Sequence, residues 1–415
     1  MTHNTVVHEP ARDLPVSAEY DVAVVGGGIA GVTAAVAAAR NGARVCLLER
    51  YCGLGGLATL GNVTIWLPLC DGRGRQVIAG MGEELLKLSV ADLEADDPPA
   101  RFTRIPACWQ PGGDPEERAQ KRYRVGFNPS TYMLALEQWV VDAGVEILYD
   151  TRFCAALRAA DGRISHLVVE NKSGRSAIAC RTAVDASGDA DLCHAAGEDT
   201  VSLHSNVLTG WFYTLTEGQL KLHQLSNRYC PEAGTQRSQG PFFAGDDARQ
   251  VTAHILQTRS KIRQRLAELR AADPGSDPRL LMPPTMACLR MTRRLAARFT
   301  LTAAHMHQWL DDAIGLTGDW RRAGPVYPVP FSSLRAVKTA NLLAAGRCIS
   351  VDNTVWDVLR AIPPCVVTGQ AAGTAAALAV AQTDGDVNAL KTGTLQEHLV
   401  SQGVLLDRAL LAPPA

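Results

Sequence analysis

The chain of 415 residues is 47% hydrophobic and 20% charged, and its formal net charge is -1. This length and composition can form a large core and predict a soluble globular protein with more than one lobe. Because the charges nearly balance, nothing in the composition favours a nucleic acid or a membrane as partner.

The first 18 residues mix His, Pro, Arg and acidic residues, without an apolar run long enough for a signal peptide or a membrane span. We expect a flexible N-terminal arm there. The 11 cysteines are scattered between Cys46 and Cys365 and form no Cys-x-x-Cys pair. This pattern predicts reduced core thiols, no metal centre and a cytoplasmic location.

The first predicted unit lies between Tyr20 and Arg50. An apolar run (DVAVV) is followed by GGGIAG, an Ala-rich helical stretch that ends at Asn41-Gly42, and a second apolar run (RVCLLE) that ends at Glu49. Strand, glycine turn, helix, strand and terminal acid together predict a dinucleotide-binding unit.

Each position of this unit has a physical reason. Gly26 permits a tight turn, Gly28 lets the backbone approach a pyrophosphate, and Gly31 lets the helix pack closely on the strand. The helix N-terminus then presents free N–H groups to the phosphates. Glu49 can accept hydrogen bonds from both hydroxyls of an adenosine ribose, and its charge would repel a 2′-phosphate.

Three later blocks extend the pattern. A second glycine cluster, in the residues ERYCGLGGLATLG that begin at Glu49, can let a large flat ring approach the backbone. Alternating strands after Asp161 end in DASGDAD, residues 185–191. Near the C-terminus, ANLLAAGRCIS (340–350) predicts a strand, and TGQAAGTAAALAVA (368–381) predicts a helix that begins at Thr368.

With these blocks the sequence resembles the FAD-dependent oxidoreductase family with a glutathione-reductase-type FAD fold. That family often has an ER...LGG.AT.G loop, an ATGD.D strand end and an NLL.AGR.IS...TGQAAG.AAA block. The resemblance covers about 20–100, 125–200 and 285–382. It implies FAD as the cofactor and an α/β fold: a Rossmann-like FAD-binding domain, with a parallel sheet and a three-stranded antiparallel insertion, plus an inserted substrate or cap domain.

The resemblance also implies which residues contact FAD, from the pyrophosphate at the glycine turn to the flavin pyrimidine edge near Gly369. Ser187 stands where the family usually has Thr, which keeps the hydroxyl. The implied contacts are Gly26, Gly28, Ala30, Gly31, Glu49, Arg50, Gly55, Gly56, Ala58, Thr59, Ser187, Gly188, Asp189, Gly346, Arg347, Gly369 and Gly373.

These blocks predict four parts of the chain. The parts are a flexible arm (1–18), an FAD-binding domain (19–200 and 325–395, with an excursion at 60–125), a substrate or cap domain (201–324) and a C-terminal tail (396–415).

Four residues are candidates for substrate binding or catalysis: Arg290, Arg294, Arg360 and Tyr327. A guanidinium grips a carboxylate with two parallel hydrogen bonds, so an arginine can anchor an acidic substrate. Bracing of the domain junction is the alternative for Arg290 and Arg294. If the resemblance holds, the chain before the last helix brings Arg360 close to the flavin, and Tyr327 offers a hydroxyl at the domain boundary.

The sequence contains no second G-x-G-x-x-G unit and no disulfide pair after the first domain. We therefore expect hydride transfer between a small organic substrate and flavin N5, in the dehydrogenase or oxidase direction, with an unidentified electron acceptor or O2. Two alternatives stay open: a monooxygenase that uses NAD(P)H and O2, and a non-catalytic flavoprotein subunit or scaffold. Covalent attachment of the flavin and the oligomeric state also stay open.

Overall fold

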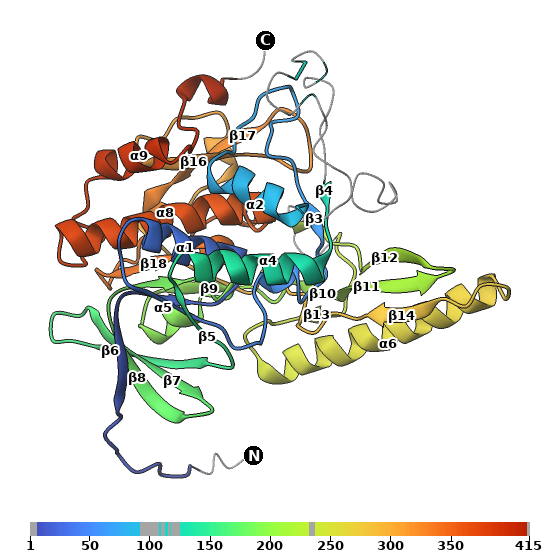
Figure 1. The fold of residues 1–415 in the computed structure, drawn as a ribbon, viewed down its shortest axis with the longest axis horizontal. Coiled ribbons are helices and arrows are strands. Elements are labelled where there is room, and N and C mark those ends of the chain that lie inside the picture. The colour runs from blue at the N-terminus through green and yellow to red at the C-terminus, as the bar shows by residue number, and fades with distance from the viewer. Residues whose placement is uncertain are drawn as a thin grey trace.

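A computed structural model describes residues 6–91, 108, 113–114, 117, 125–231 and 237–412. Its central feature is a seven-stranded sheet. The strands of this sheet are β1 (Val16–Val25), β2 (Val45–Leu48), β5 (Glu146–Leu148), β6 (Arg152–Arg158), β7 (Ile164–Asn171), β8 (Gly174–Asp185) and β18 (Leu342–Ala344). They follow the order β5-β2-β1-β8-β7-β6, and β18 pairs with β8 (Figure 1).

The parallel part of the sheet brings several strand ends together. β1 runs parallel to β2 and β8, β2 to β5, and β18 to β8. In this register Val25 lies beside Leu48 and Asp185, and Asp185 lies beside Ala344. The carboxyl ends of four strands therefore meet at one edge, where open α/β sheets bind their ligands.

β8 is 12 residues long and takes part in two kinds of pairing. Its first half pairs antiparallel with β7, which pairs antiparallel with β6, while its second half pairs parallel with β1. The predicted three-stranded antiparallel insertion on a parallel sheet is thus confirmed.

Two helices of small residues, α1 (Ile29–Arg40) and α8 (Ile362–Gln382), pack against each other beside the parallel strands. α8 is long and apolar enough to span a membrane, yet 83% of its most apolar segment is buried inside the protein. Its hydrophobicity therefore belongs to the core. α2 (Met81–Ser89) and α4 (Pro129–Asp142) lie next to this pair (Figure 1).

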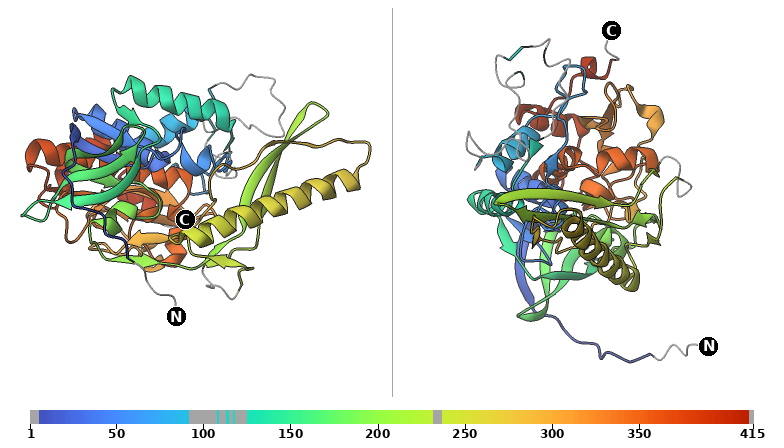
Figure 2. Two further views of the ribbon diagram at one scale, coloured as in Figure 1. Left: turned by 90° about the horizontal axis from the view of Figure 1, so that it is seen from below. Right: turned by 90° about the vertical axis from the view of Figure 1, so that its right-hand side faces the viewer.

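A second sheet projects from the body of the molecule. It consists of β12 (Gln219–Ser226), β11 (Thr209–Thr216) and β14 (Arg279–Met282), and the long helix α6 (Ala248–Ala272) runs along it (Figure 2). α6 has one buried face, and the rest of its surface is largely exposed. Its buried positions, His254, Thr258 and Ile262, are spaced by four residues and so share one face.

The other helices and strands of the described residues lie outside these two sheets. They are β3 (Ile65–Trp66), β4 (Val125–Gly126), α5 (Asp191–Ala195), β9 (Thr200–Ser202), β10 (Asn206–Val207), β13 (Phe242–Phe243), β15 (Arg293–Leu295), β16 (Ala313–Gly318), β17 (Val326–Pro330), α7 (Asn353–Leu359) and α9 (Thr392–Ser401). Of the excursion predicted at 60–125, residues 60–91 are described. Most of the residues between 92 and 124 lie outside the described part of the chain. The division into domains stays a prediction.

Candidate FAD site

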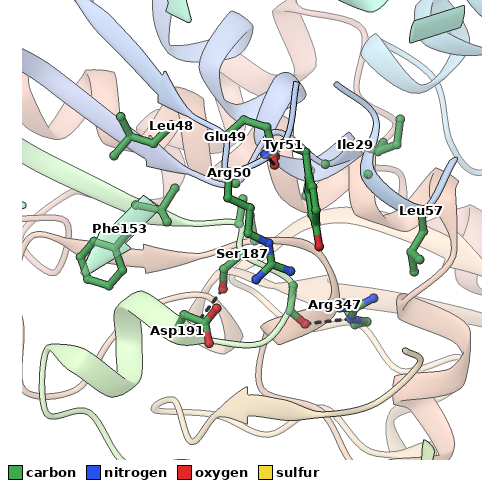
Figure 3. Close-up of a pocket in the computed structure, with 18 of the residues that line it drawn as sticks. Ile29, Leu48, Glu49, Arg50, Tyr51, Leu57, Phe153, Ser187, Asp191 and Arg347 are labelled. Carbon is green, nitrogen blue, oxygen red and sulfur yellow. Dashed lines mark hydrogen bonds between the residues drawn. The ribbon is translucent and has the colours of Figure 1, made fainter. Parts of the chain in front are cut away.

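A cavity of about 330 Å³ lies at the edge where β1, β2, β8 and β18 end (Figure 3). Segments from across the chain line it. They contribute Val25, Gly26, Gly28, Ile29, Ala30, Leu48, Glu49, Arg50, Tyr51, Gly55, Gly56, Leu57, Ala58, Thr151, Arg152, Phe153, Cys154, Ala186, Ser187, Gly188, Asp191, Ala195, Met286, Ala345, Arg347, Arg360, Ile362 and Cys365.

The turn between β1 and α1 fits a pyrophosphate. Gly26 has a φ of +103°, and a Cβ there would lie 2.5 Å from the carbonyl oxygen of Ala186. A Cβ on Gly31 would lie 1.7 Å from the carbonyl oxygen of Gly26, so only glycine lets α1 pack this closely. At Gly28, the N-cap of α1, a Cβ would have no atom within 4 Å, so the backbone is open to a ligand.

The second glycine cluster packs on this turn. The N–H of Gly55 donates to the carbonyl oxygen of Gly27 at 2.8 Å, and a Cβ on Gly56 would lie 3.1 Å from Cα of Gly28. The two glycine segments therefore form one wall of the cavity. Thr59 is not among the lining residues, because its hydroxyl turns inward and donates to the carbonyl oxygen of Leu54.

Glu49 is buried and lies directly after β2. Its Oε2 accepts the N–H of Gly27 at 2.6 Å and its Oε1 accepts the N–H of Tyr51 at 2.8 Å. Burial raises the pKa of Glu49, and these hydrogen bonds oppose the rise. Each carboxylate oxygen keeps a further lone pair that can accept a ribose hydroxyl.

The segment Thr151–Cys154 forms a further wall of the cavity, which the sequence does not predict. The N–H of Thr151 donates to the carbonyl oxygen of Glu49 at 3.1 Å, which holds this segment beside the end of β2. Figure 3 shows Phe153 below Leu48 on this side of the cavity. Nothing in the local sequence marks these residues, since their place depends on the pairing of β5 with β2.

The loop after β8 is organised by the buried carboxylate of Asp185. Its Oδ1 accepts the N–H of Ser187 at 3.0 Å and the hydroxyl of Ser187 at 2.6 Å, and its Oδ2 accepts the N–H of Cys193 at 2.8 Å. Ser187 in turn accepts the N–H of Asp191 at 3.0 Å, the hydrogen bond drawn in Figure 3. Ser187 and Gly188 thereby line the cavity.

Arg347 ties this loop to the segment after β18. Its Nε donates to the carbonyl oxygen of Gly188 at 2.8 Å, and its Nη2 lies 2.9 Å from Oδ1 of Asp189. Arg347 lines the cavity, whereas Asp189 and Gly346 are not among the lining residues. Gly346 instead packs on α1, where its Cβ would lie 2.7 Å from Cβ of Ala30.

The prediction that the last long helix begins at Thr368 is wrong, because α8 begins at Ile362. Pro363 and Pro364 belong to its first turn, where the missing N–H of proline costs no intrahelical hydrogen bond. The positive end of α8 therefore lies at Ile362 and Cys365, both of which line the cavity.

Gly369 and Gly373 lie further along α8, at its contact with α1. A Cβ on Gly369 would lie 2.4 Å from the carbonyl oxygen of Ala30, and one on Gly373 would lie 2.0 Å from that of Ala34. Neither glycine is among the lining residues. In this structure both glycines allow close helix packing.

The four predicted catalytic residues separate into two groups. Arg360 lines the cavity. Arg290 is not among the lining residues but lies near Arg360 at the ring of Tyr229, since the Cζ atoms of Arg290 and Arg360 are 4.9 Å and 6.0 Å from the ring centroid. Arg294 lies over Trp356, 5.7 Å from its ring centroid, and Tyr327 is buried in β17. Neither of these two is among the lining residues.

The wall of the cavity also contains a partly exposed carboxyl group, that of Asp191. Burial raises the pKa of Asp191 to about 6, and the charges of Asp189 and Asp185 add to this rise. An ion pair with Arg293, at 2.7 Å, opposes the rise without cancelling it. Between about pH 4 and 6 the folded chain therefore holds a proton that the unfolded chain has lost, so this group makes the free energy of unfolding fall as the pH rises.

FAD carries a negatively charged pyrophosphate and should bind best when Asp191 is neutral. We expect the affinity of the apoprotein for FAD to fall about three- to tenfold between pH 5 and pH 7. Asp191→Asn should flatten this profile, measured as the FAD dissociation constant from quenching of flavin fluorescence. Asp199→Asn, at an exposed residue paired with Lys338, is the control. A wild-type profile in Asp191→Asn would contradict the assignment.

Among the described residues, no three His, Cys, Asp or Glu side chains come together as ligands of a metal ion would. The cavity is lined by glycines, backbone N–H groups, the carboxylate of Glu49 and arginines, a set that suits a dinucleotide.

Several solved structures are similar to the chain. A geranylgeranyl bacteriochlorophyll reductase-like protein from Thermoplasma acidophilum is 12% identical, with a TM-score of 0.45, over 93% of this chain and 92% of that one. OxyS anhydrotetracycline hydroxylase from Streptomyces rimosus is 14% identical, with a TM-score of 0.47, over 92% of this chain and 65% of that one. The 3-ketosteroid-delta4-(5alpha)-dehydrogenase from Rhodococcus jostii RHA1 is 17% identical, with a TM-score of 0.40, over 87% of this chain and 97% of that one.

Sequence identities this low carry no information about the reaction. No curated protein matches the chain. The sequence does match the family described as FAD dependent oxidoreductase, over residues 21–206 and 203–399. The two ranges cover both the glycine turn and α8. The chain therefore belongs to the FAD-dependent oxidoreductase family, with FAD as its cofactor.

Proposed function

We propose that this enzyme transfers a hydride between a small organic substrate and the N5 atom of FAD, in the dehydrogenase or oxidase direction. FAD supplies the acceptor for the two electrons, and the protein supplies position and electrostatics. The observation that carries the proposal is the cavity, which joins the glycine turn of α1 to the N-terminus of α8.

Met286, Arg360, Ile362 and Cys365 line what we call the α8 side of the cavity. Here the positive end of the α8 dipole favours negative charge, and a guanidinium is available to orient a polar substrate. The residues proposed for the pyrophosphate and the adenosine, Gly28 and Glu49, line the same cavity at the start of α1 and directly after β2. We infer that the substrate reacts on the α8 side.

The strand pairing between residues 201 and 324 bears on where the electrons come from. It supports a donor other than a nicotinamide cofactor bound in a second domain of this chain. In the described residues between 201 and 324, the strands pair antiparallel. A second dinucleotide-binding unit would need parallel strands joined by a helix. The substrate itself is then the simplest donor.

An anaerobic spectral screen tests this function. The purified holoenzyme is mixed with panels of amino acids, hydroxy acids, amines and reduced nicotinamides, and the visible band of oxidised flavin is followed. We expect an organic substrate to bleach this band without any nicotinamide. Bleaching by reduced nicotinamide alone would instead support a reductase or a monooxygenase, and bound FAD that no compound reduces would support a non-catalytic flavoprotein.

A further inference from the structure

Two arginines from distant parts of the sequence share one aromatic ring at the α8 side of the cavity. The guanidinium carbons of Arg290 and Arg360 lie 4.9 Å and 6.0 Å from the ring centroid of Tyr229. Arg360 lines the cavity in which we place the substrate, whereas Arg290 and Tyr229 are not among the lining residues. The hydroxyl of Tyr229 donates to Sδ of Met291 at 2.9 Å, which fixes the ring.

The two cations differ in how they are neutralised. Arg360 is paired with Asp357, since its Nε and Nη2 lie 2.8 Å and 2.5 Å from Oδ1 of that residue. Asp357 is also 3.7 Å from Nη1 of Arg321, but Arg321 has a closer partner, because its Nε and Nη2 lie 2.9 Å and 3.0 Å from the carboxylate oxygens of Asp319. The cluster keeps a positive charge in excess.

Arg290 has no carboxylate within ion-pair distance among the described residues. Its Nη2 donates to the hydroxyl of Ser226 at 2.9 Å, whereas its Nη1 is buried and has no hydrogen-bond partner in the described part of the chain. Burial, and after it the charge of Arg360, lower the pKa of Arg290 to about 10. Arg290 is still protonated at neutral pH.

Arg290 is partly exposed as a residue, but its Nη1 is buried and without a hydrogen-bond partner among the described residues, and an incoming anion would remove the cost of that unpaired group. We propose that Arg290 and Arg360, held against Tyr229, bind a carboxylate group of the substrate at the α8 side of the cavity. The proposal rests on the proposed function, because it names the class of substrate that would meet FAD there. A guanidinium matches a carboxylate with two parallel hydrogen bonds, so the contact orients the substrate as well as attracting it.

Binding without turnover tests this assignment. Benzoate and propionate are titrated into the oxidised holoenzyme, and binding is followed by calorimetry and by perturbation of the flavin spectrum. Their neutral counterparts benzamide and propionamide are titrated in parallel. We expect the carboxylates to bind at least about tenfold more tightly than the amides, because each brings a negative charge to the buried Nη1 of Arg290.

Arg290→Gln and Arg360→Gln should each weaken carboxylate binding by at least about tenfold and leave amide binding unchanged. Arg279→Gln removes an exposed arginine of β14, paired with Asp277, and should bind both probes like the wild type. Retained FAD and an unchanged Tm show that each variant is folded. If Arg290→Gln does not fold, Arg290→Lys keeps the charge and should lose affinity for the carboxylates alone.

Equal affinity for acids and amides in the wild type would overturn the proposal, and so would wild-type carboxylate binding in both glutamine variants. The binding experiment involves no turnover, so it can detect a preference for carboxylates even if no compound reduces the flavin. Failure of the proposed function is therefore distinguishable from failure of the carboxylate site. A flavin that organic substrates reduce, with no preference for acids, would refute the carboxylate site and leave the proposed function intact.

Discussion

Replacement of Gly28 by alanine is expected to weaken FAD binding at least a hundredfold, ~2.7 kcal/mol, and to leave the apoprotein folded. The backbone at Gly28 has φ -68° and ψ 176°, which alanine adopts without strain. No protein atom lies within 4 Å of the added methyl group, so the apoprotein loses no packing. The methyl would instead occupy the space through which the pyrophosphate approaches the backbone.

The matched variant is Gly31→Ala, one helical turn away in the same motif. Its Cβ would lie 1.7 Å from the carbonyl oxygen of Gly26, so α1 must shift from β1 at a cost of about 3 kcal/mol. We expect Gly31→Ala to lower the Tm of the apoprotein and to lose FAD, whereas Gly28→Ala loses FAD alone. Calorimetry of both apoproteins and FAD titration distinguish the two. Wild-type FAD affinity in Gly28→Ala would contradict the site.

Gly373→Ala is expected to lower the free energy of unfolding of the apoprotein by about 3 kcal/mol. Its methyl group would lie 2.0 Å from the carbonyl oxygen and 2.9 Å from Cα of Ala34, and neither backbone atom can move without displacing α1. Denaturant unfolding of the apoprotein measures this change without interference from FAD.

Gly393→Ala is the control, because this glycine lies in helix α9 and no atom is within 4 Å of the added methyl group. Alanine should there stabilise the protein by about 0.5–1 kcal/mol. If Gly373 instead contacts the flavin edge, as the family resemblance implies, Gly373→Ala would leave apoprotein stability unchanged and alter the flavin spectrum. A fall in the free energy of unfolding of the apoprotein would therefore support the packing role, and an unchanged value with an altered flavin spectrum would support the flavin contact.

The sequence predicted best where function depends on local geometry. The β1–α1–β2 unit is continuous in the chain, and its glycines and terminal acid stand at the fixed spacing of one short motif. Gly26, Gly28 and Glu49 therefore line the cavity as the motif predicts. The fold class follows for the same reason, since alternating strands and tight turns are short-range signals.

Local sequence patterns do not predict the position of a residue when that position depends on tertiary contacts. Gly369 and Gly373 look alike in the sequence whether they pack on a helix or contact a flavin. The structure shows that both pack on α1, and their contact with the flavin stays a prediction. The start of α8 was missed because two prolines in succession suggest a break, although the first helical turn tolerates them. Tyr229, which joins Arg290 to Arg360, carries no motif at all.

The contact between α1 and α8 also has a consequence for how the protein is made. α1 and β2 leave the ribosome long before β18 and α8, and at roughly 5–20 residues per second the delay amounts to tens of seconds. During that time the apolar face of α1 that later meets α8 has no native neighbour, and the cofactor site is still incomplete. A nascent chain of this enzyme is therefore expected to need shielding from aggregation, and FAD can be captured only after nearly all of the chain has been synthesised.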